Sequence, residues 1–155
     1  MPRIALVTDS TCDLGPQALA ERHVAMVPLK VHFGDDTYLD WIDLTPSEFY
    51  PMLRTSVQLP TTSQPTPGEF AEVYRRLAEE GADGIVSIHL SAKLSGTFES
   101  AMMAAGTSPI PVRVVDSTFV SGAMTIALDQ PCAAAHSGRY LDARVKAHLA
   151  ACARP

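Results

Sequence analysis

Short, largely apolar runs recur along the chain and are rich in β-branched side chains. Ile4–Thr8, Gly84–Leu90 and Val112–Val115 have this form, which a strand takes when a parallel sheet buries both of its faces. A further β-prone run covers Val24–Val31, but Pro28 lies inside it. Because proline removes a ladder hydrogen bond, this segment is expected to form an edge strand or an irregular one.

Two tetrapeptides share the pattern of a helix start. Thr45–Glu48 and Thr66–Glu69 each place threonine at the N-cap, proline at the first helical position and glutamate at the third. The helices are expected to run to about Arg54 and Glu80, with a polar loop over Gln58–Pro65 between them. Further helices are expected over Leu14–Arg22 with Asp13 as the cap, over Gly96–Ala105, over Phe119–Asp129 and, after a break at Pro131, over Leu141–Ala153.

Strands and helices therefore alternate along a chain of 155 residues, a length that suits one domain. This order predicts an α/β fold with a parallel sheet and helices on both faces. Open sheets of this kind bind ligands beyond the carboxyl ends of their strands. Polar segments follow predicted strands at Asp9–Thr11, Ser91–Thr97 and Asp116–Ser117. The sequence therefore predicts a binding site at that edge of the sheet.

Charge and cysteine usage narrow the partners and the compartment. The net charge is −5 and no stretch is rich in lysine, so binding to a nucleic-acid backbone is not expected. The three cysteines, Cys12, Cys132 and Cys152, are widely spaced, which favours reduced thiols and no metal site. The first apolar run is too short for a signal peptide or a membrane span. A cytoplasmic protein without stable membrane insertion is expected.

Two hydroxyl-rich segments carry the candidate chemistry. Thr61–Gln64 offers four side-chain hydrogen-bonding groups between two prolines that stiffen the backbone. In Ser91–Thr97, Ser95 and the free N–H groups of the following helix start are expected to face one crevice. These groups favour binding of a carboxylate, with no catalytic residue and no cofactor. The alternatives are a self-capping loop and simple N-capping by Ser95.

Enzymatic alternatives rest on single residues. Asp9, directly after the first strand, resembles the nucleophile of a metal-dependent phosphatase, but Thr11 stands where such enzymes have a second carboxylate. Ser95 lacks the glycine–x–serine–x–glycine elbow of serine hydrolases. His89 lies inside an apolar strand and is expected to pack in the core. Trp41 is expected either to cover an apolar pocket or to anchor a surface loop.

Five segments together resemble the bacterial DegV-type fatty-acid-binding proteins, which include the lipid-presenting subunit of fatty acid kinase. They are Val7–Leu14, Val27–Leu29, Leu59–Pro65, Ser91–Thr97 and Val114–Ser117. The segments occur in the family's order and at similar spacing over about residues 3 to 150. Their combination is more specific than any one of them alone.

The resemblance implies a Rossmann-like EDD fold, here the DegV N-terminal domain over residues 1–155, with the family's C-terminal domain absent. It also implies binding of one long-chain fatty acid, such as palmitate, without catalysis. The carboxylate contacts would fall on Thr62 or Ser63 and on Ser95, and Gly96 and Thr97 would shape that loop. Further candidates for lining the site are Asp9, Ser10, Thr11, Asp116 and Ser117.

The resemblance finally implies a protein partner. In that family the catalytic subunit of fatty acid kinase phosphorylates the presented carboxylate for phospholipid synthesis. A homodimer is a further alternative, and a chain of this length is either a fragment or a natural short form. Two other functions stay open at this point, a small metal-dependent phosphatase that uses Asp9 and a truncated scaffold or interaction module.

Overall fold

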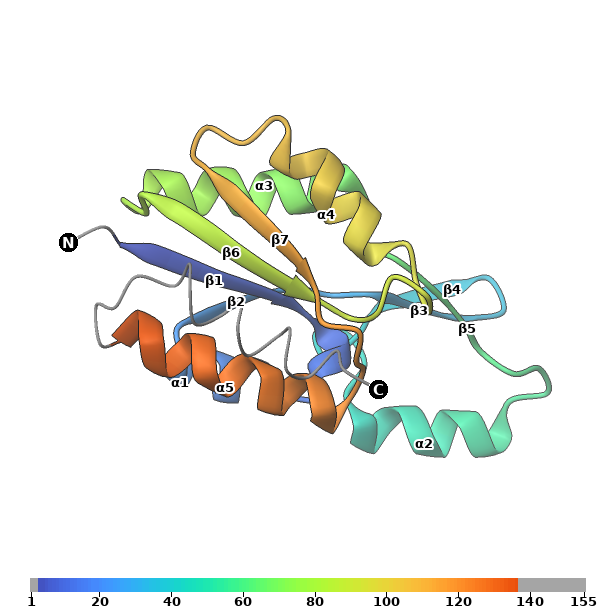
Figure 1. Cartoon of the computed structure of the whole chain (residues 1–155). Helices are drawn as coiled ribbons and strands as arrows, with labels where there is room; N and C mark the ends of the chain where they lie inside the picture. The colour runs from blue at the N-terminus through green and yellow to red at the C-terminus, as the bar shows by residue number, and fades with distance from the viewer. Residues whose placement is uncertain (1–2, 137–155) are drawn as a thin grey trace.

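The main sheet of the protein is parallel and has four strands, in the order β2-β1-β6-β7 (Figure 1). The computed structural model describes residues 3–136. The strands are β1 (Ile4–Asp9), β2 (Val24–Val27), β6 (Gly84–His89) and β7 (Val112–Asp116). Every residue of β6 is buried, as expected for a central strand that is covered on both faces. The predicted parallel α/β sheet is confirmed.

Helices cover both faces of this sheet, as predicted. The helices α3 (Pro67–Glu79) and α4 (Thr97–Ala105) lie on one face, and α1 (Pro16–Glu21) and α5 (Gly122–His136) lie on the other (Figure 1). Successive residues of a strand point to opposite faces, so neighbours on β1 enter different apolar clusters. Leu6 packs with Leu19 and Met124, whereas Val7 packs with Phe70 and Ala101.

A second sheet, which the sequence did not predict, stands beside the first. It is antiparallel, in the order β4-β3-β5, and contains β3 (Lys30–Phe33), β4 (Asp36–Leu39) and β5 (Thr61–Ser63). The run Val24–Val31 does not form one strand, because β2 ends before Pro28 and the chain enters the second sheet at Lys30. The expected edge position is confirmed, since β2 is an edge strand of the main sheet. The predicted loop Gln58–Pro65 likewise contains β5. These strands are short and mostly polar, so their periodicity gives little signal.

The two threonine helix starts are confirmed. Thr45 is the N-cap of α2 (Pro46–Thr55), and Thr66 is the N-cap of α3. The carboxylates of Glu48 and Glu69 accept hydrogen bonds from the N-cap N–H groups at 2.9 and 2.7 Å, which completes a capping box at each helix. Both helices end within one residue of the predicted positions.

Two predicted caps are wrong. Asp13 has a left-handed φ of 57°, and its carboxylate accepts a hydrogen bond from the Ser121 hydroxyl. Its side chain is therefore used by a distant loop, and Gly15 is the N-cap of α1. Ser95 lies one residue before the N-cap of α4, which is Gly96. Its hydroxyl is consequently not a simple helix cap.

The last described helix also differs from the prediction. We expected a helix over Phe119–Asp129 that breaks at Pro131, but α5 begins at Gly122 and continues through Pro131 to His136. A proline removes one backbone hydrogen bond and bends a helix without necessarily ending it. The predicted helix Leu141–Ala153 lies outside the described residues. Within residues 3–136, no helix has both the length and the apolar composition that a membrane crossing needs.

Alkaline pH is expected to destabilise the fold through two buried acids. Burial raises the pKa of the Cys12 thiol from 9.0 to about 11 and that of the Tyr74 phenol from 10.0 to about 12. The protonated thiol and phenol contribute their full stabilisation at pH values below their pKa values in the unfolded chain. This stabilisation is lost as the pH rises through their pKa values in the folded protein. The free energy of unfolding should therefore fall between pH 9 and pH 12. Urea denaturation at each pH measures this loss. If the free energy of unfolding of a Cys12→Ala variant falls as steeply between pH 9 and 11 as that of the wild type, the Cys12 thiol does not contribute to the loss.

Candidate functional site

A pocket of about 740 Å³ lies beside the carboxyl ends of β1 and β6. Thr11 follows β1 and Leu90 follows β6, and both line the pocket. The opposite parts of the wall come from the antiparallel sheet, through Val31 and Thr62, and from α2, through Phe49. The structure therefore has a pocket at the edge of the parallel sheet where open α/β sheets bind ligands.

Apolar side chains from distant segments form much of the pocket wall. They include Leu29, Val31, Leu44, Phe49, Leu90 and Leu94. Sequence reasoning missed these residues, because they are scattered over several elements and share no periodicity. Trp41 also lines the pocket, and its ring packs against Gly15, where an added Cβ would lie 3.0 Å from the indole. The indole therefore lines the pocket and is anchored against Gly15.

The polar part of the lining is neutral or acidic. Thr11, Thr62, Ser63, Ser95 and Gly96 line the pocket, as does Gln64, which sequence reasoning did not single out as a contact. Asp13 and Asp40 line it as well, and burial raises the pKa of the Asp40 carboxyl. No lysine or arginine is among the described lining residues. Within the described lining, hydrogen bonds to an anion would come from uncharged groups.

Five other candidates lie outside the lining and support the surrounding loops. Asp9, Ser10 and Thr97 are completely buried, and Ser117 is nearly so. The Ser10 hydroxyl accepts a hydrogen bond from the Leu29 N–H at 3.0 Å. The Asp116 carboxylate accepts hydrogen bonds from two backbone N–H groups of neighbouring loops, at 3.3 and 2.8 Å. These side chains hold the framework of the site and do not reach its surface.

The register of the antiparallel sheet separates Thr62 from Ser63. Thr62 pairs with Val31, which lines the pocket, so both side chains point to the same face of the sheet. Ser63 is one residue further on, and its hydroxyl lies 2.8 Å from Nε2 of His32 on the other face. Both residues line the pocket, and within the described residues Thr62 is the one of the two whose hydroxyl is not engaged by another side chain.

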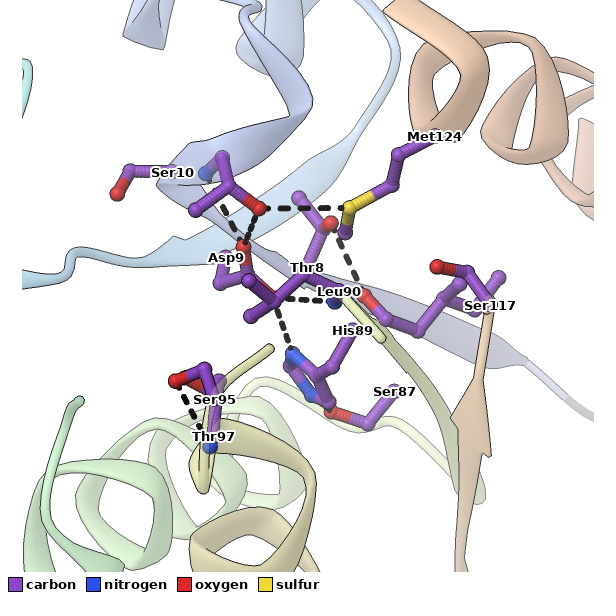
Figure 2. Close-up of polar contacts among 12 residues, drawn as sticks. Thr8, Asp9, Ser10, Ser87, His89, Leu90, Ser95, Thr97, Ser117 and Met124 are labelled. Carbon is purple, nitrogen blue, oxygen red and sulfur yellow. Dashed lines mark hydrogen bonds and ion pairs between the residues drawn. The ribbon is translucent and has the colours of Figure 1, made fainter. Parts of the chain in front are cut away.

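Thr97 orients the hydroxyl of Ser95 (Figure 2). The backbone N–H of Thr97 donates to Ser95 Oγ at 3.3 Å, and the two hydroxyl oxygens are 2.9 Å apart. Thr97 is completely buried, so its hydroxyl proton needs an acceptor within the protein, and Ser95 Oγ is in reach. Either hydroxyl can be the donor in this pair; with Thr97 as the donor, Ser95 Oγ accepts two hydrogen bonds and its own proton can be donated to a ligand.

Asp9 has no oxygen available for catalysis. Its Oδ1 accepts hydrogen bonds from the Thr11 N–H at 3.0 Å and from the Thr11 hydroxyl at 2.6 Å. Its Oδ2 accepts from the Leu90 N–H and lies 3.0 Å from His89 Nδ1 (Figure 2). A completely buried carboxylate with four donors around it cannot reach a phosphate ester. This geometry argues against the phosphatase alternative. It gives Asp9 a structural role, because its carboxylate connects the ends of β1 and β6 by hydrogen bonds.

A buried chain of hydrogen bonds continues from Asp9 into the core. Tyr74 donates its hydroxyl to Ser87 at 2.8 Å, and Ser87 Oγ lies 2.6 Å from His89 Nε2. Because Ser87 accepts from Tyr74, its own proton serves Nε2, and His89 donates from Nδ1 to Asp9. The order serine, histidine, aspartate is that of a hydrolase triad, but all three residues are completely buried. His89 is thus a packed core histidine, as predicted.

Comparison with known sequences identifies the relatives of this chain. A family model described as "Uncharacterised protein, DegV family" matches residues 3–154. DegV domain-containing protein SCO2569 of Streptomyces coelicolor is 41% identical over 144 residues, which are 93% of this chain and 51% of that protein. DegV domain-containing protein BH3627 of Halalkalibacterium halodurans is 49% identical over 104 residues, 67% of this chain and 37% of its own length.

Solved structures lead to the same family. A DegV family protein from Thermus thermophilus, described as binding fatty acid, superposes with a TM-score of 0.86 at 41% identity, over 97% of this chain and 53% of its own. DegV from Bacillus subtilis, described as a fatty acid binding protein, gives a TM-score of 0.90 at 32% identity, over 97% and 54%. The chain spans about half the length of these relatives. By its sequence and its fold, the chain belongs to the DegV family.

Proposed function

We propose that the pocket binds a long-chain fatty acid, with the carboxylate at the hydroxyls of Thr62 and Ser95 and the acyl chain along the apolar wall. The observation that carries this proposal is that two hydroxyl residues, Thr62 and Ser95, line the same pocket as the apolar side chains of Leu29, Phe49 and Leu94. Such a pocket suits a ligand with one small anionic end and a long apolar body. The fatty-acid-binding relatives with the same fold support this ligand class.

The acyl chain and the carboxylate of the ligand contribute differently to the binding free energy. Each methylene that leaves water contributes about 0.8 kcal/mol, so the apolar wall supplies most of the affinity. A hydroxyl that donates to a charged oxygen adds about 1.5–3 kcal/mol. The acidic side chains of Asp13 and Asp40 in the lining oppose an anion, so the head group is expected to lie at the hydroxyl side.

A carrier role follows from the neutral clamp, and we include it in the proposal. Hydroxyl donors hold a carboxylate without neutralising it, so one oxygen keeps a lone pair for attack on a phosphoryl donor. The partner in this role is the catalytic subunit of fatty acid kinase, acting for phospholipid synthesis in the cytoplasm, and the chain itself contributes no catalytic residue. Residues 1–155 then form the domain that holds the head group.

Loss of either clamp hydroxyl is expected to weaken fatty acid binding. Thr62→Val and Ser95→Ala each remove one donor, which costs about 1 kcal/mol or more and raises Kd about fivefold or more. Ser63→Ala is the matched control, because the Ser63 hydroxyl is engaged by His32. Binding of palmitate can be followed by the fluorescence of Trp41, which lines the pocket and is the single tryptophan of the chain.

Two results would contradict the proposal. A wild-type protein that yields no long-chain acid on lipid extraction, and takes none up on incubation with palmitate, excludes the ligand class. If Ser63→Ala weakens binding as much as Thr62→Val does, the assignment of the clamp to one face of β5 is wrong.

A further inference from the structure

Gln64 places an uncommitted amide beside the proposed clamp. It follows β5 directly and lines the pocket together with Thr62 and Ser95. Among the described residues, its amide has no hydrogen-bond partner, although it can donate two hydrogen bonds and accept others. Gln64 is solvent-exposed, so its amide can exchange water for a ligand without breaking a hydrogen bond within the described part of the protein.

The amide is positioned by a close contact with Gly96. A Cβ added to Gly96 would lie 2.6 Å from both Nε2 and Oε1 of Gln64 and 2.8 Å from its Cδ. The backbone of Gly96 has φ −76° and ψ 13°, values that other residues adopt, so the conformation does not require glycine here. The amide of Gln64 occupies the position where a side chain would begin, so a side chain at residue 96 would displace this amide. The contact brings β5 and the loop after β6 together next to Ser95.

A bound carboxylate can accept more hydrogen bonds than two hydroxyls supply. A carboxylate has two oxygens with about four acceptor sites, and the described lining holds no cation. An N–H that donates to an ionised oxygen forms a charge-assisted hydrogen bond. Gln64 is a further neutral side-chain donor of the described lining, and its amide lies against Gly96, next to Ser95.

We propose that Gln64 is a third donor to the bound carboxylate and determines the preference for a free fatty acid over its uncharged derivatives. The inference rests on the proposed function and adds head-group selectivity to it. Gly96 has the linked role of leaving room for the amide, which explains why two loops from different parts of the chain meet at a glycine.

The test compares an acid with an alcohol of the same chain length. Gln64→Met keeps the length of the side chain and removes both donors. It is expected to raise Kd for palmitate about tenfold and to leave Kd for hexadecanol within about twofold, because an alcohol offers no ionised oxygen. Trp41 fluorescence reports both titrations on the full chain. Gln64 is solvent-exposed, so the thermal unfolding midpoint should not change.

A double-mutant cycle tests the contact itself. Gly96→Ala should weaken palmitate binding as Gln64→Met does, because the new methyl displaces the amide. In a Gln64→Ala background the same Gly96→Ala change should have little further effect, since the space is then empty.

The outcomes separate the two proposals. If Gln64→Met loses the same affinity for palmitate as for hexadecanol, or no affinity for either, the selectivity role is overturned while the proposal of fatty acid binding stands. A wild-type chain that binds neither ligand would instead overturn the proposed function. Additive effects in the cycle would show that Gly96 and Gln64 act independently, against the inference.

Discussion

Replacing Asp9 by asparagine is expected to lower the free energy of unfolding by about 3 kcal/mol. The carboxylate accepts hydrogen bonds from Thr11, Leu90 and His89, and it is completely buried. Asparagine has nearly the same shape but turns one acceptor oxygen into a donor. That NH₂ group would face either Thr11 or His89, so at least one buried donor would lose its partner.

Urea denaturation of the two proteins measures this loss, and Asp35→Asn is the matched control. Asp35 is exposed, so its variant should unfold within about 0.5 kcal/mol of wild type. The same pair of variants tests the phosphatase alternative. The structural role is wrong, and Asp9 is a nucleophile, if two results are found together. The wild type would hydrolyse a phosphate ester in the presence of magnesium, and the Asp9→Asn variant would be as stable as wild type but inactive.

The parallel sheet and its helices could be predicted because their signals are local. A strand such as β6 is buried on both faces and appears as a continuous apolar run. The capping boxes at Thr45 and Thr66 are visible as threonine, proline and glutamate in fixed positions. The antiparallel sheet lacks such a signal, because β5 has three polar residues and its pairing with β3 joins segments about thirty residues apart.

The site could be predicted only in part, for a related reason. The hydroxyl-rich segments are compositional features, so the sequence could single out Thr62 and Ser95, and both line the pocket. Whether the hydroxyl of Thr62 or that of Ser63 is engaged by His32 depends on the pairing of β5 with β3, and this pairing cannot be predicted from a segment that is interpreted as a loop. The same limit applies to Thr97, which was predicted beside Ser95 but lies buried behind it.

The buried polar chain links the core to the proposed site. Asp9 holds the N–H groups of Thr11 and Leu90, and both of these residues line the pocket. His89 in turn holds Asp9, and the ring of Phe70 packs edge-on against His89, with centroids 4.9 Å apart and an interplanar angle of 78°. A change in the packing of Phe70 on α3 can therefore affect the pocket wall through the side chains of His89 and Asp9.

Phe70→Ala is expected to be the most damaging single substitution in this region. Phe70 is completely buried and packs on both Tyr74 and His89. Removing a buried phenyl ring costs about 3–5 kcal/mol, a large share of the roughly 5–15 kcal/mol that holds a domain folded. Loss of the ring also opens a cavity beside the hydrogen bond of His89, so palmitate binding should weaken in the fraction that remains folded.

Chemical denaturation and Trp41 fluorescence distinguish these two effects of the Phe70 change. Met103→Ala on α4 is the control, because Met103 is 67% exposed and its variant should stay within about 0.5 kcal/mol of wild type. Phe70→Leu should retain more stability than Phe70→Ala, since a smaller cavity remains. If Phe70→Ala loses less than about 1 kcal/mol, the ring does not support the buried chain. Tyr74, which is connected to His89 through Ser87, would then be the residue of α3 that links the core to the pocket wall.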